Sequence, residues 1–66
     1  MSGLNAQIEM ARKHVAEGRR IVTAQRRRIA NGELRGTAAL ELLATFEQSL
    51  EVFEQDLAQL LSKHEK

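Results

Sequence analysis

The chain of 66 residues contains no cysteine, proline, tryptophan or tyrosine, and its only aromatic residues are Phe46 and Phe53. Without cysteine, disulfide bonds cannot hold the fold together. Without proline, no position forces a helix to end. A domain of this size rarely draws a large surplus of stability from its own core. We therefore expect regular helix packing that is completed by another copy of the chain or by another protein.

Long apolar runs are also missing. No stretch approaches the roughly 20 consecutive apolar residues that span a bilayer, and the first five residues lack the basic start and apolar core of a signal peptide. We expect no membrane partner and a cytoplasmic location, which the absence of cysteine fits. A composition of 42% hydrophobic and 29% charged residues is too apolar for a disordered tail, so the chain should fold.

Turn chemistry occurs only in the middle of the chain, between Asn31 and Thr37. Gly32 can adopt the left-handed conformation that ends a helix, and the Thr37 hydroxyl is suited to cap the start of the next one. The predicted elements are one helix over about 4–31, a loop over 32–36 and a second helix over about 37–62. At 1.5 Å per residue both helices are roughly 40 Å long. Equal lengths and a short loop predict an all-α fold, a single antiparallel two-helix hairpin.

Apolar residues recur every seven positions in both segments, as in a coiled-coil seam. In the first segment one row is Ile8, Val15, Val22 and Ile29, and the neighbouring row is Leu4, Ala11, Gly18 and Gln25. In the second segment the rows are Ala39, Phe46, Phe53 and Leu60, and Leu43, Leu50 and Leu57.

Folding the chain at the loop sets large residues against small ones. Gly18 should lie near Leu50 and Phe53, and Ala11 near Leu57, an alternation that lets two helices interdigitate. The same register sets Ile29 against Leu40 and Leu43. A glycine inside a helix costs about 1 kcal/mol relative to alanine, so we expect a packing role for Gly18.

The second helix carries more apolar residues than one neighbour can cover, because Leu40 and Leu61 flank its seam on one side, Leu42 on the other, and Val52 lies nearly opposite. On the first helix Ile21 flanks the seam and Met10 lies further round. Such surface predicts that two hairpins dimerise into a four-helix bundle. The candidate packing and interface residues are Ile8, Val15, Gly18, Val22, Ile29, Leu40, Leu42, Leu43, Phe46, Leu50, Phe53, Leu57, Leu60 and Leu61.

Gln25 occupies a position of the small row where a core residue is expected. It could act as a buried polar residue that penalises wrong pairings. We favour the simpler interpretation that the seam ends near the loop and leaves Gln25 half exposed.

The net charge of +1 conceals a division along the chain. Residues 1–36 hold eight Lys and Arg against three Glu, and residues 37–66 hold two Lys against six Asp and Glu. We expect Arg12, Arg19 and Arg26 to pair with acidic residues of the second helix. Lys13, Arg20, Arg27 and Arg28 would face solvent as a basic stripe able to contact phosphates of nucleic acid or an acidic partner. The chain has no Tyr or Trp for base stacking, so we favour a solvated face.

Catalytic, cofactor-binding and metal-binding residues are not predicted. There is no cysteine nucleophile, and His14 and His64 lie far apart in the sequence. His14 and Glu17 share a helix face, but di-metal bundles use Glu-x-x-His repeated on paired helices, and here the order is reversed and occurs once. We expect His14 on the surface and His64 at a helix end.

Three stretches resemble a family of short, uncharacterised helical-hairpin proteins of rhizobial-type proteobacteria. They are His14-Val15-Ala16-Glu17-Gly18-Arg19-Arg20-Ile21, Gln25-Arg26 and Leu42-Leu43-Ala44-Thr45-Phe46-Glu47-Gln48-Ser49-Leu50. The resemblance spans most of residues 10–58 and implies a bacterial protein without an assigned activity. The chain departs from the family at the loop, which is more basic here. Rop-type hairpins, which form four-helix bundles and hold RNA, are similar in architecture alone.

These observations predict a non-enzymatic interaction module or small subunit that associates with itself. One alternative is a small regulatory RNA- or DNA-binding hairpin that uses the basic stripe. Another is an inhibitor or accessory subunit that docks its spare leucines on a larger bacterial protein.

Overall fold

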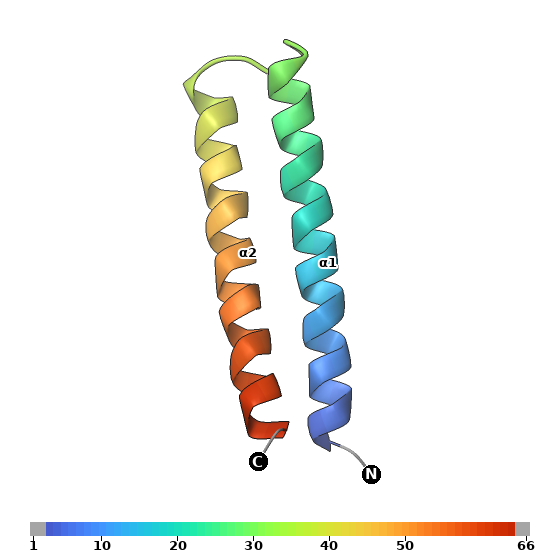
Figure 1. The fold of residues 1–66 in the computed structure, drawn as a ribbon. Coiled ribbons are helices and arrows are strands. Elements are labelled where there is room, and N and C mark those ends of the chain that lie inside the picture. The colour runs from blue at the N-terminus through green and yellow to red at the C-terminus, as the bar shows by residue number, and fades with distance from the viewer. Residues whose placement is uncertain (1–2, 65–66) are drawn as a thin grey trace.

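The computed structural model describes residues 3–64 as two helices, α1 (Gly3–Ala30) and α2 (Thr37–His64), each of 28 residues. They run antiparallel, with the loop at one end and both chain termini at the other (Figure 1). The molecule is a rod of 47 × 14 × 13 Å. The described residues contain no strand, so the predicted all-helical hairpin is confirmed. Helix α1 ends one residue earlier than predicted and α2 continues two residues further.

Helix α1 ends in a Schellman motif centred on Gly32, which has a φ of 78°. The Gly32 N–H donates to the Ile29 carbonyl at 3.0 Å, and the Glu33 N–H donates to the Arg28 carbonyl at 2.9 Å. These bonds satisfy carbonyls that the last helical turn leaves free. The Arg35 Nε also donates to the Gly32 carbonyl, at 3.2 Å. The predicted role of Gly32 is confirmed.

Helix α2 starts from a second glycine in the left-handed region, Gly36, with a φ of 90°. Its carbonyl accepts the first helical hydrogen bond, from the Leu40 N–H at 3.4 Å. Gly36 is therefore the N-cap residue, and Thr37 is the first residue inside the helix. The prediction of Thr37 as the N-cap is wrong, because the chain enters the helix one residue earlier than the threonine signal suggested.

The two helices bury their facing strips unequally. Helix α1 buries Ile8, Ala11, Val15, Val22 and Gln25, whereas α2 buries Ala39 alone. The larger side chains of the α2 seam are only half-buried, namely Leu43, Phe46, Leu50, Phe53, Leu57 and Leu60. None of the described side chains is fully buried. One neighbouring helix covers the small residues of α1 but cannot cover the bulk of α2.

Gly18 marks the close approach of the helices. A Cβ atom placed there would lie 3.1 Å from Leu50 Cδ1 and 3.6 Å from Phe53 Cδ2. The predicted register of Gly18 is therefore confirmed, and the missing side chain is what admits these two large residues.

Leu40 does not join the hairpin core. Its side chain is 57% exposed, while Ile29 and Leu43 are half-buried. The prediction that Leu40 packs against Ile29 is therefore wrong, because the Leu40 side chain points to one side of the seam.

Gly32→Ala should lower the free energy of unfolding by about 1–2 kcal/mol, because a Cβ is disfavoured in the left-handed conformation. Thermal and urea melts would measure the change. Gly3→Ala is the matched control, since Gly3 lies in the first turn of α1 with no atom near the position of the new Cβ, and it should leave the melt unchanged or raise it. Equal melts for the two variants would contradict the role of Gly32.

Gly18→Leu should lower the free energy of unfolding by about 1–3 kcal/mol, because its side chain would overpack the contact with Leu50 and Phe53. In Gly18→Ala the Cβ meets the movable end of Leu50, and helix propensity rises by about 1 kcal/mol, so this variant should melt at or above the parent temperature. Circular dichroism melts of both variants test the close approach. A parent-like melt for Gly18→Leu would count against it.

Candidate protein interface

One side of the hairpin is closed by ion pairs. Arg19 Nη2 lies 3.2 Å from Glu54 Oε2, and Arg26 pairs with Glu47. Arg19 and Arg26 are seven residues apart on α1, as are Glu47 and Glu54 on α2, so the two pairs share one side of the rod. We call this side the ion-pair face. All four side chains are at least 40% exposed, so each pair is worth only about 0–1 kcal/mol.

Two of the three expected pairings of the flanking arginines are thus present. The third is not, because no ion pair of Arg12 occurs among residues 3–64. Leu40 lies seven residues before Glu47, and Leu61 lies seven after Glu54. These two leucines therefore extend the ion-pair face at its ends.

The opposite side has no ion pair in the described chain, and it is hollowed at two places. Its α1 border is the row His14, Ile21 and Arg28, and its α2 border is the row Leu42, Ser49 and Asp56. One hollow brings His14 beside Asp56, and the other brings Ile21 and Arg28 beside Leu42. Because the residues in each row are spaced by seven, both hollows lie on the same side. We call this side the groove face.

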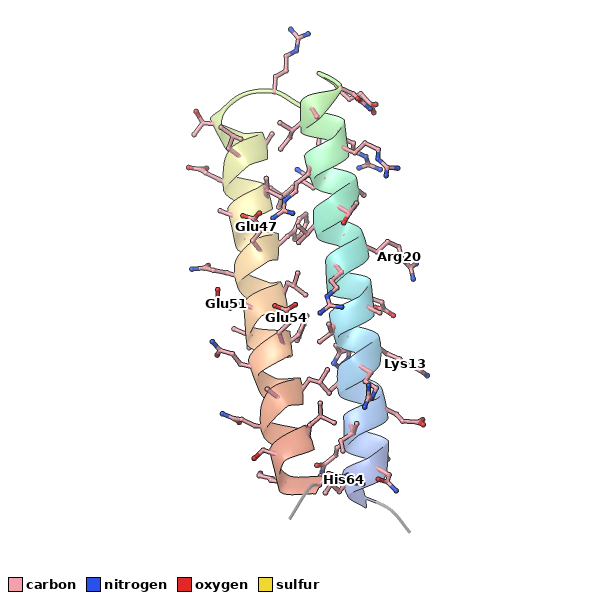
Figure 2. All side chains as sticks on the ribbon, in the orientation of Figure 1. Lys13, Arg20, Glu47, Glu51, Glu54 and His64 are labelled. Atoms are coloured by element: carbon pink, nitrogen blue, oxygen red, sulfur yellow. The ribbon has the colours of Figure 1, made fainter. Side chains whose placement is uncertain are left out.

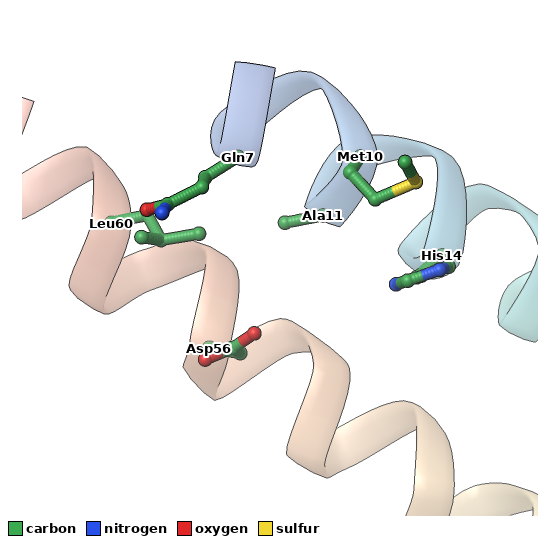
Figure 3. A pocket seen from close by; sticks show the side chains of 6 residues that line it. All are labelled: Gln7, Met10, Ala11, His14, Asp56 and Leu60. Atoms are coloured by element: carbon green, nitrogen blue, oxygen red, sulfur yellow. The ribbon is translucent and has the colours of Figure 1, made fainter. Parts of the chain in front are cut away.

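The hollow nearer the termini has a volume of about 310 Å³. Figure 3 shows the side chains that line it, and these are Gln7, Met10, Ala11, His14, Asp56 and Leu60. The ring of His14 lies 5.3 Å from that of Phe53, at an angle of 34° between the planes. His14 is exposed, as predicted, yet it covers part of an aromatic residue of the seam, a contact that the sequence did not predict.

The hollow nearer the loop also has a volume of about 310 Å³ and is lined by Ile21, Ala24, Gln25, Arg28, Leu42 and Phe46. Gln25 is 5% exposed, and its Nε2 atom has no hydrogen-bond partner within the described chain. The expectation that Gln25 is half exposed is wrong. The seam does not end below Gln25, because α2 begins at Thr37 and Phe46 reaches the level of Gln25.

Most of the large apolar side chains that the hairpin leaves exposed belong to the groove face. Ile21 (46% exposed) and Leu42 (46%) line its loop-side hollow, and Met10 (55%) lines the other. Val52 (61%) lies on the side of α2 that is turned away from the seam and lines neither hollow of the groove face. Only Leu40 among the exposed large apolar residues of the described chain lies on the ion-pair face.

The predicted basic stripe is divided by the structure. Lys13, Arg20 and Arg27 are seven residues apart and form one row, and Figure 2 shows Lys13 and Arg20 on the side of α1 that points away from α2. Arg28 is one residue further round and lines the groove. The four residues therefore do not form one stripe, because successive helix positions are turned by about 100°.

Chemistry-bearing side chains are sparse. No group of three His, Cys, Asp or Glu side chains that could hold a metal ion occurs within residues 3–64. His64 lies in the last turn of α2, where a basic side chain interacts favourably with the helix dipole. His14 and Asp56 share a hollow, with no third titratable group lining it.

The comparisons with known proteins add no relative, because no family model, curated protein or solved structure matches this chain. The resemblance to the proteobacterial hairpin family stays a prediction. Neither α1 nor α2 has an apolar stretch suited to crossing a lipid bilayer.

The sequence predicted which residues occupy the seam, but it did not distinguish the two sides of it. The available signal was the composition of the flanking rows. Beside the seam of α1 the row on one side is Arg12, Arg19 and Arg26, and the row on the other is His14, Ile21 and Arg28. Comparing those rows separates a face of three arginines from a face of mixed composition.

Proposed function

We propose that the chain is a non-enzymatic interaction module that associates with itself, two hairpins packing by their groove faces into a four-helix bundle. The observation that carries the proposal is the difference in exposed side chains between the two faces. Arginine and glutamate pairs cover one face, whereas the other presents hollows and exposed Met10, Ile21 and Leu42. The cytoplasm is the proposed location.

The exposed area of the chain supports this proposal. A compact monomer of 7.4 kDa is expected to expose about 4,200 Å², whereas this chain exposes 5230 Å². The difference, about 1,000 Å², is close to the area of about 800 Å² that each partner loses in a standard interface. One interface of ordinary size would reduce the exposed area of each hairpin to that of a compact domain.

Half-burial of the α2 seam supports it as well. Phe46 and Leu60 line the two hollows, and Phe53 lies beneath His14. A second pair of helices on the groove face would cover these three residues. Fully burying a large apolar side chain contributes about 1.5–3 kcal/mol, so the gain for so small a domain is substantial.

Leu42→Ser should weaken the dimer. Burying the exposed part of one leucine is worth about 1 kcal/mol, and a two-fold dimer loses it twice, so the dissociation constant should rise by roughly thirtyfold. Native mass spectrometry and light scattering over a dilution series would measure it. Leu40→Ser is the matched control, since Leu40 is an exposed leucine of the same helical turn on the ion-pair face, and it should leave the dissociation constant within about threefold of the parent.

Equal effects of the two substitutions would contradict the assignment of the interface to the groove face. A parent chain that stays monomeric at all concentrations would overturn self-association. Its groove face would then be free for the alternative occupant, a larger bacterial protein that presents an amphipathic helix pair.

A second candidate function is nucleic-acid binding. Lys13, Arg20 and Arg27 form one row by their spacing of seven, and Figure 2 shows Lys13 and Arg20 on the outer side of α1. None of the three makes an ion pair within the described chain. Successive side chains of the row are seven residues, or about 10 Å, apart. Such a row of positive charges can contact the phosphate groups of a nucleic acid. It lies away from the groove face, so self-association leaves it accessible.

Replacing Lys13, Arg20 and Arg27 with alanine should abolish RNA or DNA binding, because the variant loses the row of positive charges that phosphates attract. Fluorescence anisotropy with a labelled RNA hairpin and a labelled DNA duplex measures it, and parent affinity should fall steeply with salt. Arg12→Ala is a control for a single lost positive charge outside the row. Binding by the triple variant equal to that of the parent would exclude the row as the binding site.

A further inference from the structure

Gln25 is the most unusual residue of the hairpin. It is 95% withdrawn from solvent, since its exposure is 5%, and its Nε2 atom finds no acceptor in the described chain. Buried amide groups are nearly always hydrogen-bonded, and each exception calls for an explanation. Gln25 lines the loop-side hollow of the groove face. Its Nε2 atom is covered in the isolated hairpin, so a turn of the side chain towards the hollow would bring it to an acceptor of the molecule that packs there.

A second hairpin can pack on the groove face in two isologous ways. With both loops at the same end, α1 of each copy lies against α2 of the other. With the loops at opposite ends, α1 lies against α1 and α2 against α2. All neighbouring helices are antiparallel in both arrangements, so helix packing alone does not choose between them.

Charge favours the first arrangement. Helix α1 carries seven Lys and Arg against two Glu, and α2 carries five Asp and Glu against one Lys. With the loops together, each basic helix has an acidic helix on both sides around the bundle. With the loops apart, basic helices adjoin each other, and like charges in contact disfavour that pairing.

The layers of the seam favour it too. Along the rod, Ala11 shares a hollow with Leu60, Gly18 contacts Phe53, and Gln25 shares a hollow with Phe46. With the loops together, each layer of one hairpin lies at the level of the same layer in the second copy. Small and large residues then alternate around the bundle axis. Gln25 then lies at the same level as Gln25 of the second copy, on the helix diagonally across the bundle axis. With the loops apart, Gln25 falls at the level of Ala11 and Leu60, where a glutamine faces no like residue and only the Gln7, His14 and Asp56 side chains that line that hollow could accept from it.

We propose that two copies associate through the groove face with their loops at the same end, and that the Gln25 amides of the two copies hydrogen-bond to each other. Each Nε2 donates to the Oε1 of the other copy. This inference rests on the proposed self-association and specifies its orientation. A single buried polar pair of this kind sets register and orientation in coiled coils. Gln25 is thus a specificity residue of the interface.

The orientation can be measured because the chain has no cysteine. Glu33→Cys places one spin label in the exposed loop, and pulsed dipolar spectroscopy gives the distance between the labels of two copies. Loops together predict a distance below about 30 Å, since adjacent helix axes lie 8–10 Å apart. Loops apart predict about 40 Å or more, because 28 helical residues at 1.5 Å each separate the ends of the rod.

The outcomes separate this inference from the proposed function. A dimer with a short distance supports both. A dimer with the long distance alone leaves self-association standing and overturns the orientation proposed here. A monomer by light scattering, with no dipolar coupling between labels, overturns both.

The role of Gln25 is tested by adding Gln25→Leu to the labelled chain. Without the polar pair, a second population at the long distance should appear while the mass stays that of a dimer. Gln55→Leu is the matched control, because Gln55 is exposed on α2 and lines none of the hollows, and its distance distribution should equal that of the labelled parent. A single short distance in Gln25→Leu would show that Gln25 does not set the orientation.

Discussion

A helix with one neighbour can bury only one strip of its surface, and this constraint shapes every other feature of the hairpin. The strip of α1 is narrow and made of small or branched residues, so α2 covers it well. The strip of α2 is wide and made of leucine and phenylalanine, and the small side chains of α1 cannot cover it. The hairpin therefore holds its helices together at Gly18 and still exposes much of its largest side chains. Association through the groove face is our proposal for how the second strip is covered.

The difference between the ion-pair face and the groove face follows from the residues that flank the seam. Arg19 and Arg26 reach across to Glu54 and Glu47. On the other side no ion pair bridges the helices in the described chain, Arg28 is the one long charged residue of the flanking rows, and two hollows remain. The ion pairs contribute little free energy each. Their larger effect is to make one face polar while the other stays apolar.

Much of this arrangement could be predicted from the sequence. Seven-residue spacing predicts both helices and their facing rows, and the pairing of Gly18 with Leu50 and Phe53 follows from folding the chain at Gly32. Gln25 could not be predicted in the same way. Its row places it on the seam, but its burial depends on how far α2 and Phe46 extend towards the loop, which is a property of the assembled pair. The start of α2 was missed for a related reason, since a left-handed glycine at position 36 caps the helix without any side-chain signal.

The asymmetry of the two faces also limits how large an assembly can become. If both broad sides of the rod were apolar, each hairpin could accept a neighbour on either side, and stacking would continue into an open-ended layer. A two-fold contact through one face uses the same patch on both copies and closes on itself. The solvated ion-pair face then forms the outside of the closed unit and offers a third hairpin no apolar surface of comparable extent. Arg19, Arg26, Glu47 and Glu54 make one side of the rod polar. They would therefore contribute less by holding the two helices together than by preventing open-ended polymerisation.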